Sequence, residues 1–227
     1  MMTPTDFVDA LQAAVLPSVF NPWRDQCPLH DLDDAAERRR ENLRLMLEGA
    51  LKGEITTMWI GRDLGYRGGR RTGVPLTDEV HLPFAASLLG DVLLARATHG
   101  PMVAERTAAV VWRVLEKIRQ PVVLWNVFPF HPHDIDDPMS NRCHTRAERA
   151  ATWPLLEALI GMVQPDRIVA IGRDASLALA DLGVKADAVR HPSYGGQTEF
   201  IAGMTRLYAL SDEPPLFAPR HASLEFV

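Results

Sequence analysis

Three polar residues with complementary chemistry each stand at the end of a short apolar segment of the chain: Asp63, Asn126 and His191. A carboxylate can orient a water molecule or balance a developing cation. A side-chain amide presents a donor and an acceptor together, which suits the edge of a pyrimidine base. An imidazole can stabilise negative charge that builds on a carbonyl oxygen. If these residues meet in space, they can recognise a base and assist chemistry on it.

Each of these residues also has a purely structural interpretation. Asp63 can cap a turn, Asn126 can order a loop, and His191 before Pro192 can belong to a surface turn. The functional interpretation depends on the joint placement of the three residues at strand ends. The strands and helices that position these three residues therefore decide between the structural and the functional interpretation.

The apolar segments predict four buried strands, at residues 55–61, 121–127, 167–172 and 186–190. Helical patterns surround them at 3–15, 33–51, 80–94, 103–118, 146–163, 174–182 and 200–210, the fifth opened by a capping box of Thr145 and Glu148. Strands that alternate with helices imply right-handed crossovers and a parallel sheet covered on both faces. We therefore predict an α/β fold, a three-layer sandwich with a central four-stranded parallel sheet flanked by helices. Ligands of such sheets bind at the carboxyl ends of the strands.

Length and composition predict one domain, with a helical N-terminal segment at about 1–52, a core at about 53–210 and a short tail at 211–227. The chain is 47% hydrophobic and 23% charged, as soluble proteins are. Its two cysteines, Cys27 and Cys143, exclude a disulfide framework and a four-thiolate cluster within one chain. With neither a transmembrane run nor a signal peptide in evidence, we expect a cytoplasmic protein with no membrane partner.

The net charge of −5 argues against nonspecific binding of polyanions, so the placement of the basic residues matters. Glycine allows a phosphate backbone to approach and arginine pairs with phosphate, which favours the loop after the first strand as a DNA contact. That loop carries Arg62, Arg67, Arg70 and Arg71 among glycines, and Arg142 and Arg146 can add a second contact. The run 38–40, three arginines, is instead expected on a solvated helix face.

Short motifs at the same strand ends resemble those of the uracil-DNA glycosylase superfamily. Gly61-Arg62-Asp63 with Tyr66 resembles its first motif, and His191-Pro192-Ser193 resembles its second. Asn126 stands where the superfamily has its uracil-reading asparagine. Similarity also extends through Thr72-Gly73-Val74-Pro75-Leu76 and through the strand, loop and helix that contain Asn141, Arg142, Thr145 and Glu148. The resemblance covers about residues 55–194.

The resemblance implies a base-excision repair glycosylase that flips uracil out of single- or double-stranded DNA and hydrolyses the N-glycosidic bond. It implies catalytic roles for Asp63, which orients the water, and for His191, which stabilises charge on the uracil O2. Asn126 reads the base, Tyr66 closes the pocket against a 5-methyl group, and Gly61 and Leu76 complete the base site. The DNA contacts are Arg62, Arg67, Arg70, Arg71, Arg142, Ser193 and Tyr194. No cofactor is implied, and a monomer is expected.

The sequence departs from the superfamily at several of these positions. Tyr66 lies one residue later than usual, and Leu76 replaces the aromatic residue that stacks on the base. Gly195 and Gly196 follow Tyr194 where many members carry an intercalating leucine, so Tyr194 or Gln197 is the candidate wedge. The cysteines of the iron–sulfur branch are missing, which predicts a cluster-free member. Hypoxanthine and mismatched thymine remain alternatives to uracil as the base.

Three other functions are compatible with the sequence. A metal site is one, since His131, His133, Asp134, Asp136, Asp137 and His144 lie close together in the chain. A nucleotide-binding α/β protein that uses the glycines of 61–69 is another, although the motif lacks the spacing of known phosphate loops. The third is a catalytically weak or covalently trapping uracil-DNA binder on the same fold.

Overall fold

The computed structural model describes residues 2–210, and the predicted tail at 211–227 lies outside the described residues. Its centre is a four-stranded sheet in the order β3-β2-β5-β6, and all the neighbouring strands in it are parallel. The strands are β2 (Thr57–Gly61), β3 (Val123–Asn126), β5 (Arg167–Ile171) and β6 (Asp187–Val189). The predicted four-stranded parallel sheet is therefore confirmed.

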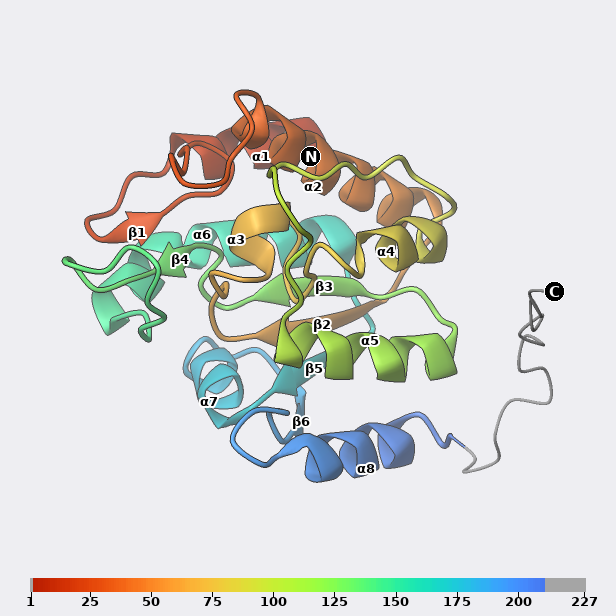
Figure 1. The fold of residues 1–227 in the computed structure, drawn as a ribbon. Helices are drawn as coiled ribbons and strands as arrows, with labels where there is room; N and C mark the ends of the chain where they lie inside the picture. The colour runs from red at the N-terminus through yellow and green to blue at the C-terminus, as the bar shows by residue number, and fades with distance from the viewer. Residues whose placement is uncertain (1, 211–227) are drawn as a thin grey trace, which may run out of the picture.

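Helices cover both faces of this sheet, which confirms the three-layer architecture (Figure 1). Alternate side chains of a strand point to opposite faces, so Met58 and Ile60 of β2 enter one core and Trp59 enters the other. The first core includes residues of α1 (Pro4–Ala13), α2 (Ala35–Lys52), α6 (Arg146–Val163) and α7 (Arg173–Asp181). The second includes residues of α4 (Leu82–Leu88), α5 (Arg106–Ile118) and α8 (Gln197–Leu207).

The ends of the long helices follow from local chemistry. The capping box of α6 is confirmed, because the Thr145 hydroxyl accepts from the backbone N–H of Glu148 and the Glu148 carboxylate accepts from that of Thr145. The predicted helix 80–94 is shorter, since α4 ends at Leu88 and both Gly90 and Asp91 take positive φ angles. No helix within residues 2–210 has the length and apolarity needed to cross a membrane.

Three short elements were not predicted. Strands β1 (Val19–Phe20) and β4 (His131–Pro132) form a two-stranded antiparallel sheet, and the single-turn helix α3 (Gly69–Thr72) lies in the loop after β2. Elements of two to four residues are too short to show a periodic pattern, so the sequence carries no signal for them. Helix α5 also begins at Arg106, three residues later than expected, which leaves Glu105 at its N-cap.

Candidate functional site

The carboxyl ends of β2, β5 and β6 surround a pocket of about 370 Å³. Asp63 from the loop after β2 and His191 from the loop after β6 both line it, although 128 residues separate them in the sequence. Leu76, Ser193 and Tyr194 line it as well. Two of the three residues that the sequence singled out are thus brought to one cavity, at the sheet edge where the fold class predicts ligand binding.

Asp63 is held on both carboxylate oxygens. Its side chain is buried, with Oδ2 accepting from Arg62 Nε at 2.6 Å and Oδ1 bonded to His144 Nδ1. Arg62 in turn donates to Asp174 Oδ2 at 2.6 Å. These contacts orient the carboxylate and place a positive charge beside it. His144, considered from sequence only as a metal ligand, is a positioning partner of Asp63 that sequence reasoning missed.

His191 is neutral at physiological pH. Burial, helped by the positive charges of Arg62 and Arg190, lowers the pKa of His191 to about 4. The backbone N–H of Ser193 donates to Nδ1 at 3.1 Å, and the Ser193 hydroxyl lies 2.7 Å from the same atom. Because Nδ1 accepts, the ring proton resides on Nε2. The imidazole is therefore a neutral donor.

A glycine permits the close approach of the His191 loop to β5. Gly172 follows β5 with a φ of +93°, and a Cβ built on it would lie 2.9 Å from the His191 Cβ. Any other residue would be both strained and in collision there.

Asn126 lies at the end of β3, opposite Gly61 of β2 in the register of the sheet. The side chain is buried, and neither Oδ1 nor Nδ2 has a hydrogen-bond partner within residues 2–210. A Cβ on Gly61 would lie 2.6 Å from Asn126 Oδ1 and 3.1 Å from Leu76 Cδ2, so these three residues are immediate neighbours. Gly61 and Asn126 do not themselves line the open pocket, whereas Leu76 does. A buried amide left unpaired is costly, so both of its polar atoms are available for hydrogen bonds to a bound molecule.

Tyr66 is not among the residues that line the pocket, so its pocket-closing role stays a prediction. Its hydroxyl accepts from Arg67 Nε at 2.8 Å, and the Arg67 guanidinium lies 5.4 Å from the centre of its ring. Gly65 lines the pocket in its place.

Arg70 and Arg71 are buried, so the prediction that they contact DNA is wrong. The Arg70 guanidinium lies 4.0 Å above the Phe20 ring and donates to Pro138 O. Arg71 Nε lies 3.2 Å from Glu79 Oε2, and Nη2 donates to Thr98 Oγ1 at 3.0 Å. The loop after β2 folds into α3 and turns these two side chains inward, where α3 packs near α2.

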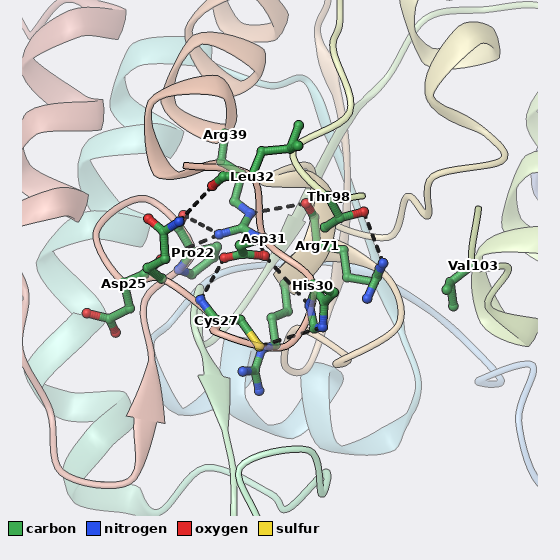
Figure 2. Close-up of polar contacts among 12 residues, drawn as sticks. Pro22, Asp25, Cys27, His30, Asp31, Leu32, Arg39, Arg71, Thr98 and Val103 are labelled. Atoms are coloured by element: carbon green, nitrogen blue, oxygen red, sulfur yellow. Dashed lines mark hydrogen bonds and ion pairs between the residues drawn. The ribbon is translucent and has the colours of Figure 1, made fainter. Parts of the chain in front are cut away.

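The same is true of Arg39, one of the three arginines expected on a solvated face. Its side chain is fully buried, pairs with Asp31 through Nη2, and donates from Nε to Arg71 O at 3.1 Å. Figure 2 shows Arg39 at the centre of these contacts, with Cys27, His30, Asp31, Arg71 and Thr98 around it. We call these six residues the Arg39 network.

Arg142 lines the pocket, and its role as a DNA contact stays a prediction. Its guanidinium binds both oxygens of the Glu148 carboxylate, at 2.6 and 2.9 Å, and also donates to His133 O and Ser18 O. These bonds tie the loop after β4 to the start of α6. Within the described part of the chain, no three His, Cys, Asp or Glu side chains gather as a metal site would require.

Sequence reasoning also missed Glu105, which lines the pocket beside Gly65. Burial, together with the nearby Asp78 carboxylate, raises the pKa of Glu105 to about 7. An acidic residue near a helix start is ordinary, so no signal in the sequence separates Glu105 from other N-terminal carboxylates.

Neither a protein-family model nor a curated protein matches this chain. Among solved structures, the chain is similar to the crystal structure of SMUG2 from Pedobacter heparinus, with a TM-score of 0.59 and 14% sequence identity. The match covers 92% of this chain and 98% of the SMUG2 chain. The two proteins therefore share a fold over almost their whole length.

Proposed function

We propose that this protein is a DNA base-excision glycosylase that flips uracil out of DNA and hydrolyses its N-glycosidic bond. The observation that carries the proposal is the unpaired, buried amide of Asn126 beside a pocket lined by Asp63 and a neutral His191. The shared fold with SMUG2, a glycosylase of the uracil-DNA glycosylase superfamily, supports it.

The proposed reaction uses one residue on each side of the scissile bond. Asp63, oriented by Arg62 and His144, holds the attacking water and balances the positive charge that develops on the sugar. As the bond to C1′ breaks, its electron pair moves onto the base. The Nε2–H of His191 stabilises the charge that collects on O2, which a neutral donor does without first transferring a proton.

Asn126 recognises the base in this scheme. Its amide offers one donor and one acceptor, as the N3–H and O4 edge of uracil requires. Gly61 leaves the room that its Oδ1 occupies, and Leu76, at a φ of +55°, presents an aliphatic surface beside it. The base-reading group is thus held in place by close packing, without hydrogen bonds of its own.

The proposed contacts with DNA lie around the rim of the pocket. Arg62 lines it, Arg67 is exposed on the adjacent loop, and Ser193 and Tyr194 lie beyond His191. Tyr194 is 97% exposed and adopts a φ of +50°, which holds its ring outward at a strained position. We propose that this ring fills the space that the flipped nucleotide leaves in the base stack.

Release of free uracil from labelled oligonucleotides tests the proposal. The purified full chain, without added metal, is expected to release uracil from single- and double-stranded substrates and to leave abasic sites that alkali cleaves. A persistent protein–DNA complex without free base would instead support a trapping binder. A panel with hypoxanthine and mismatched thymine defines the base, and release of no base from any oligonucleotide would refute the proposal.

A further inference from the structure

One carboxyl group in the pocket wall has no part in the reaction described above. Glu105 is the N-cap residue of α5, but its side chain forms no capping hydrogen bond. Its backbone N–H donates to Asp78 Oδ2 at 2.6 Å, while no described residue forms a hydrogen bond or ion pair with its carboxyl group. A structural role in capping or pairing therefore does not account for it.

The position of the carboxyl group is set by two glycines. A Cβ built on Gly65 would lie 2.3 Å from Glu105 Oε1, and one on Gly68 would lie 2.2 Å from Oε2. The side chain thus reaches from α5 across to the loop after β2, two residues beyond Asp63. It occupies a wall of the same pocket that Asp63 and His191 line.

The surroundings of Glu105 favour its protonated form. Burial is the main cause, the Asp78 carboxylate adds to it, and together they raise the pKa of Glu105 to about 7. Arg67, on the loop after β2, works in the opposite direction, as does the amino end of α5. His81 engages Asp78 through Oδ1, the oxygen that does not bind Glu105. A carboxyl group near neutrality can donate a proton at physiological pH.

The other carboxyl groups that line the pocket, Asp63 and Asp174, are both engaged by Arg62. Asp63 is paired with the Arg62 guanidinium, and Asp174 binds the same arginine in an exposed position. The pKa of His191 is lowered to about 4, so its imidazole is neutral at neutral pH, and its remaining Nε2 proton can donate a hydrogen bond but is too weakly acidic to be transferred. The surroundings of Glu105 thus differ from those of the neighbouring carboxyl groups. Such a difference in surroundings also distinguishes the acid from the base in two-carboxylate hydrolases.

We propose that Glu105 is the general acid of this pocket and protonates the departing base while the bond to C1′ breaks. The proton passes from the carboxyl group to the base, the bonding electron pair goes with the base, and water adds its oxygen to C1′. The proton that water loses leaves by way of Asp63, and Glu105 is reprotonated from solvent. This inference rests on the proposed function. It extends the substrate class to bases that depart poorly as anions, hypoxanthine among them.

Single-turnover base release as a function of pH tests this role, on oligonucleotides that contain uracil, 5-fluorouracil or hypoxanthine. The wild-type rate on hypoxanthine is expected to fall above about pH 7, as the acid is lost. Glu105→Gln cannot donate a proton, so its rate at about pH 6 falls by ~10²-fold on hypoxanthine and less on 5-fluorouracil, whose anion is the best leaving group of the three. The rate of the Glu105→Gln variant is also expected to show no fall above about pH 7. Glu116→Gln, an exposed substitution on the same helix, is the matched control and behaves as wild type.

Thermal unfolding provides a readout that does not depend on activity. The folded state binds the Glu105 proton up to about pH 7, whereas an unfolded glutamate loses it near 4.5. The stability that this proton contributes is complete below the lower value and is lost as the pH rises through the higher one. The wild type should therefore lose stability relative to Glu105→Gln between these values.

The possible outcomes separate this inference from the proposed function. If the wild type releases no base at any pH, both the proposed function and the general-acid role of Glu105 are refuted. The general-acid role alone is refuted in two cases, both with an active wild type. In one, the rate of Glu105→Gln still falls above about pH 7. In the other, the rate of Glu105→Gln is reduced by the same factor on all three bases.

Discussion

Two polar regions of this molecule differ in how their side chains are paired. In the Arg39 network, the Arg39 guanidinium meets the Asp31 carboxylate, and Asp31 Oδ2 also accepts from the Cys27 backbone N–H at 2.8 Å. Beside the pocket, the buried amide of Asn126 has no hydrogen-bond partner within residues 2–210, and neither has the carboxyl of Glu105 in the pocket wall. Buried polar groups that bind one another hold the fold together. An unpaired group is a candidate ligand contact where a pocket adjoins it, since His30 Nε2 within the network is also without a hydrogen-bond partner.

The two regions also lie on different parts of the fold. The Arg39 network joins the segment before α2, α2 itself and α3, so it fastens the N-terminal part of the chain to the loop after β2. The pocket lies at the carboxyl ends of the strands. The loop after β2 contributes to both, with Asp63 on one side and Arg71 on the other. Substitutions in the two regions should therefore affect different measurements.

The largest effect is expected in the Arg39 network. Arg39→Met leaves Asp31 buried without its counter-ion, which should lower the free energy of unfolding by about 3–5 kcal/mol. Urea denaturation measures this change. Arg38→Met is the matched control, since Arg38 pairs with Asp34 on the surface and such pairs contribute about 1 kcal/mol or less. Equal losses in the two variants would contradict the structural role of the network.

The next largest effect is expected on base release. Asp63→Ala or His191→Ala should slow the single-turnover rate by at least ~10²-fold, because each removes a main electrostatic stabiliser of the transition state. Asp174→Asn is the control for Asp63, since it contacts the same Arg62 from an exposed position and should keep most of the activity. Full activity in both alanine variants would show that the reaction takes place elsewhere.

A comparison of two buried asparagines tests the distinction between the regions directly. Asn42 donates to Thr72 O and Ala95 O and accepts from the Ala95 N–H, whereas Asn126 has no partner. Asn42→Leu should therefore lower the free energy of unfolding by about 1–3 kcal/mol, and Asn126→Leu should leave it unchanged or raise it.

The rate of base release should respond in the opposite way to the two substitutions. It should fall by at least ~10-fold in Asn126→Leu and change little in Asn42→Leu. Melting temperatures and release rates of the same two preparations give both readouts. A destabilised and fully active Asn126→Leu variant would mean that Asn126 is structural.

The smallest effect is expected at the rim of the pocket. Tyr194 is 97% exposed, so Tyr194→Ala should change the free energy of unfolding by less than about 0.5 kcal/mol. Uracil release from duplex DNA should fall by roughly 10-fold, since a wedge helps to open the base stack. Release from single strands should fall less. Equal losses on the two substrates would argue that the ring contacts the base or the backbone and does not act as a wedge.

The sequence by itself determined the sheet, the long helices and seven of the residues that line the pocket, Asp63 and His191 among them. The apolar runs in β2, β3 and β5 and the capping box of α6 depend only on residues close together in the sequence. The elements that they predict are therefore found in the structure. Asp63 and His191 could be predicted to meet because they follow parallel strands of one sheet, whose carboxyl ends share an edge. The position of Asn126, opposite Gly61, follows from the same rule.

Only the tertiary structure decided which charged residues are buried and which groups remain unpaired. Arg39, Arg70 and Arg71 looked like surface arginines because their partners Asp31, Phe20 and Glu79 lie eight or more residues away, outside the spacing of a helix face or a strand. Glu105 reaches the pocket only because α5 begins beside Gly65 and Gly68, 37 or more residues earlier in the sequence. The free energy of a buried charge depends on what surrounds it in space, and a local pattern of residues does not contain that information.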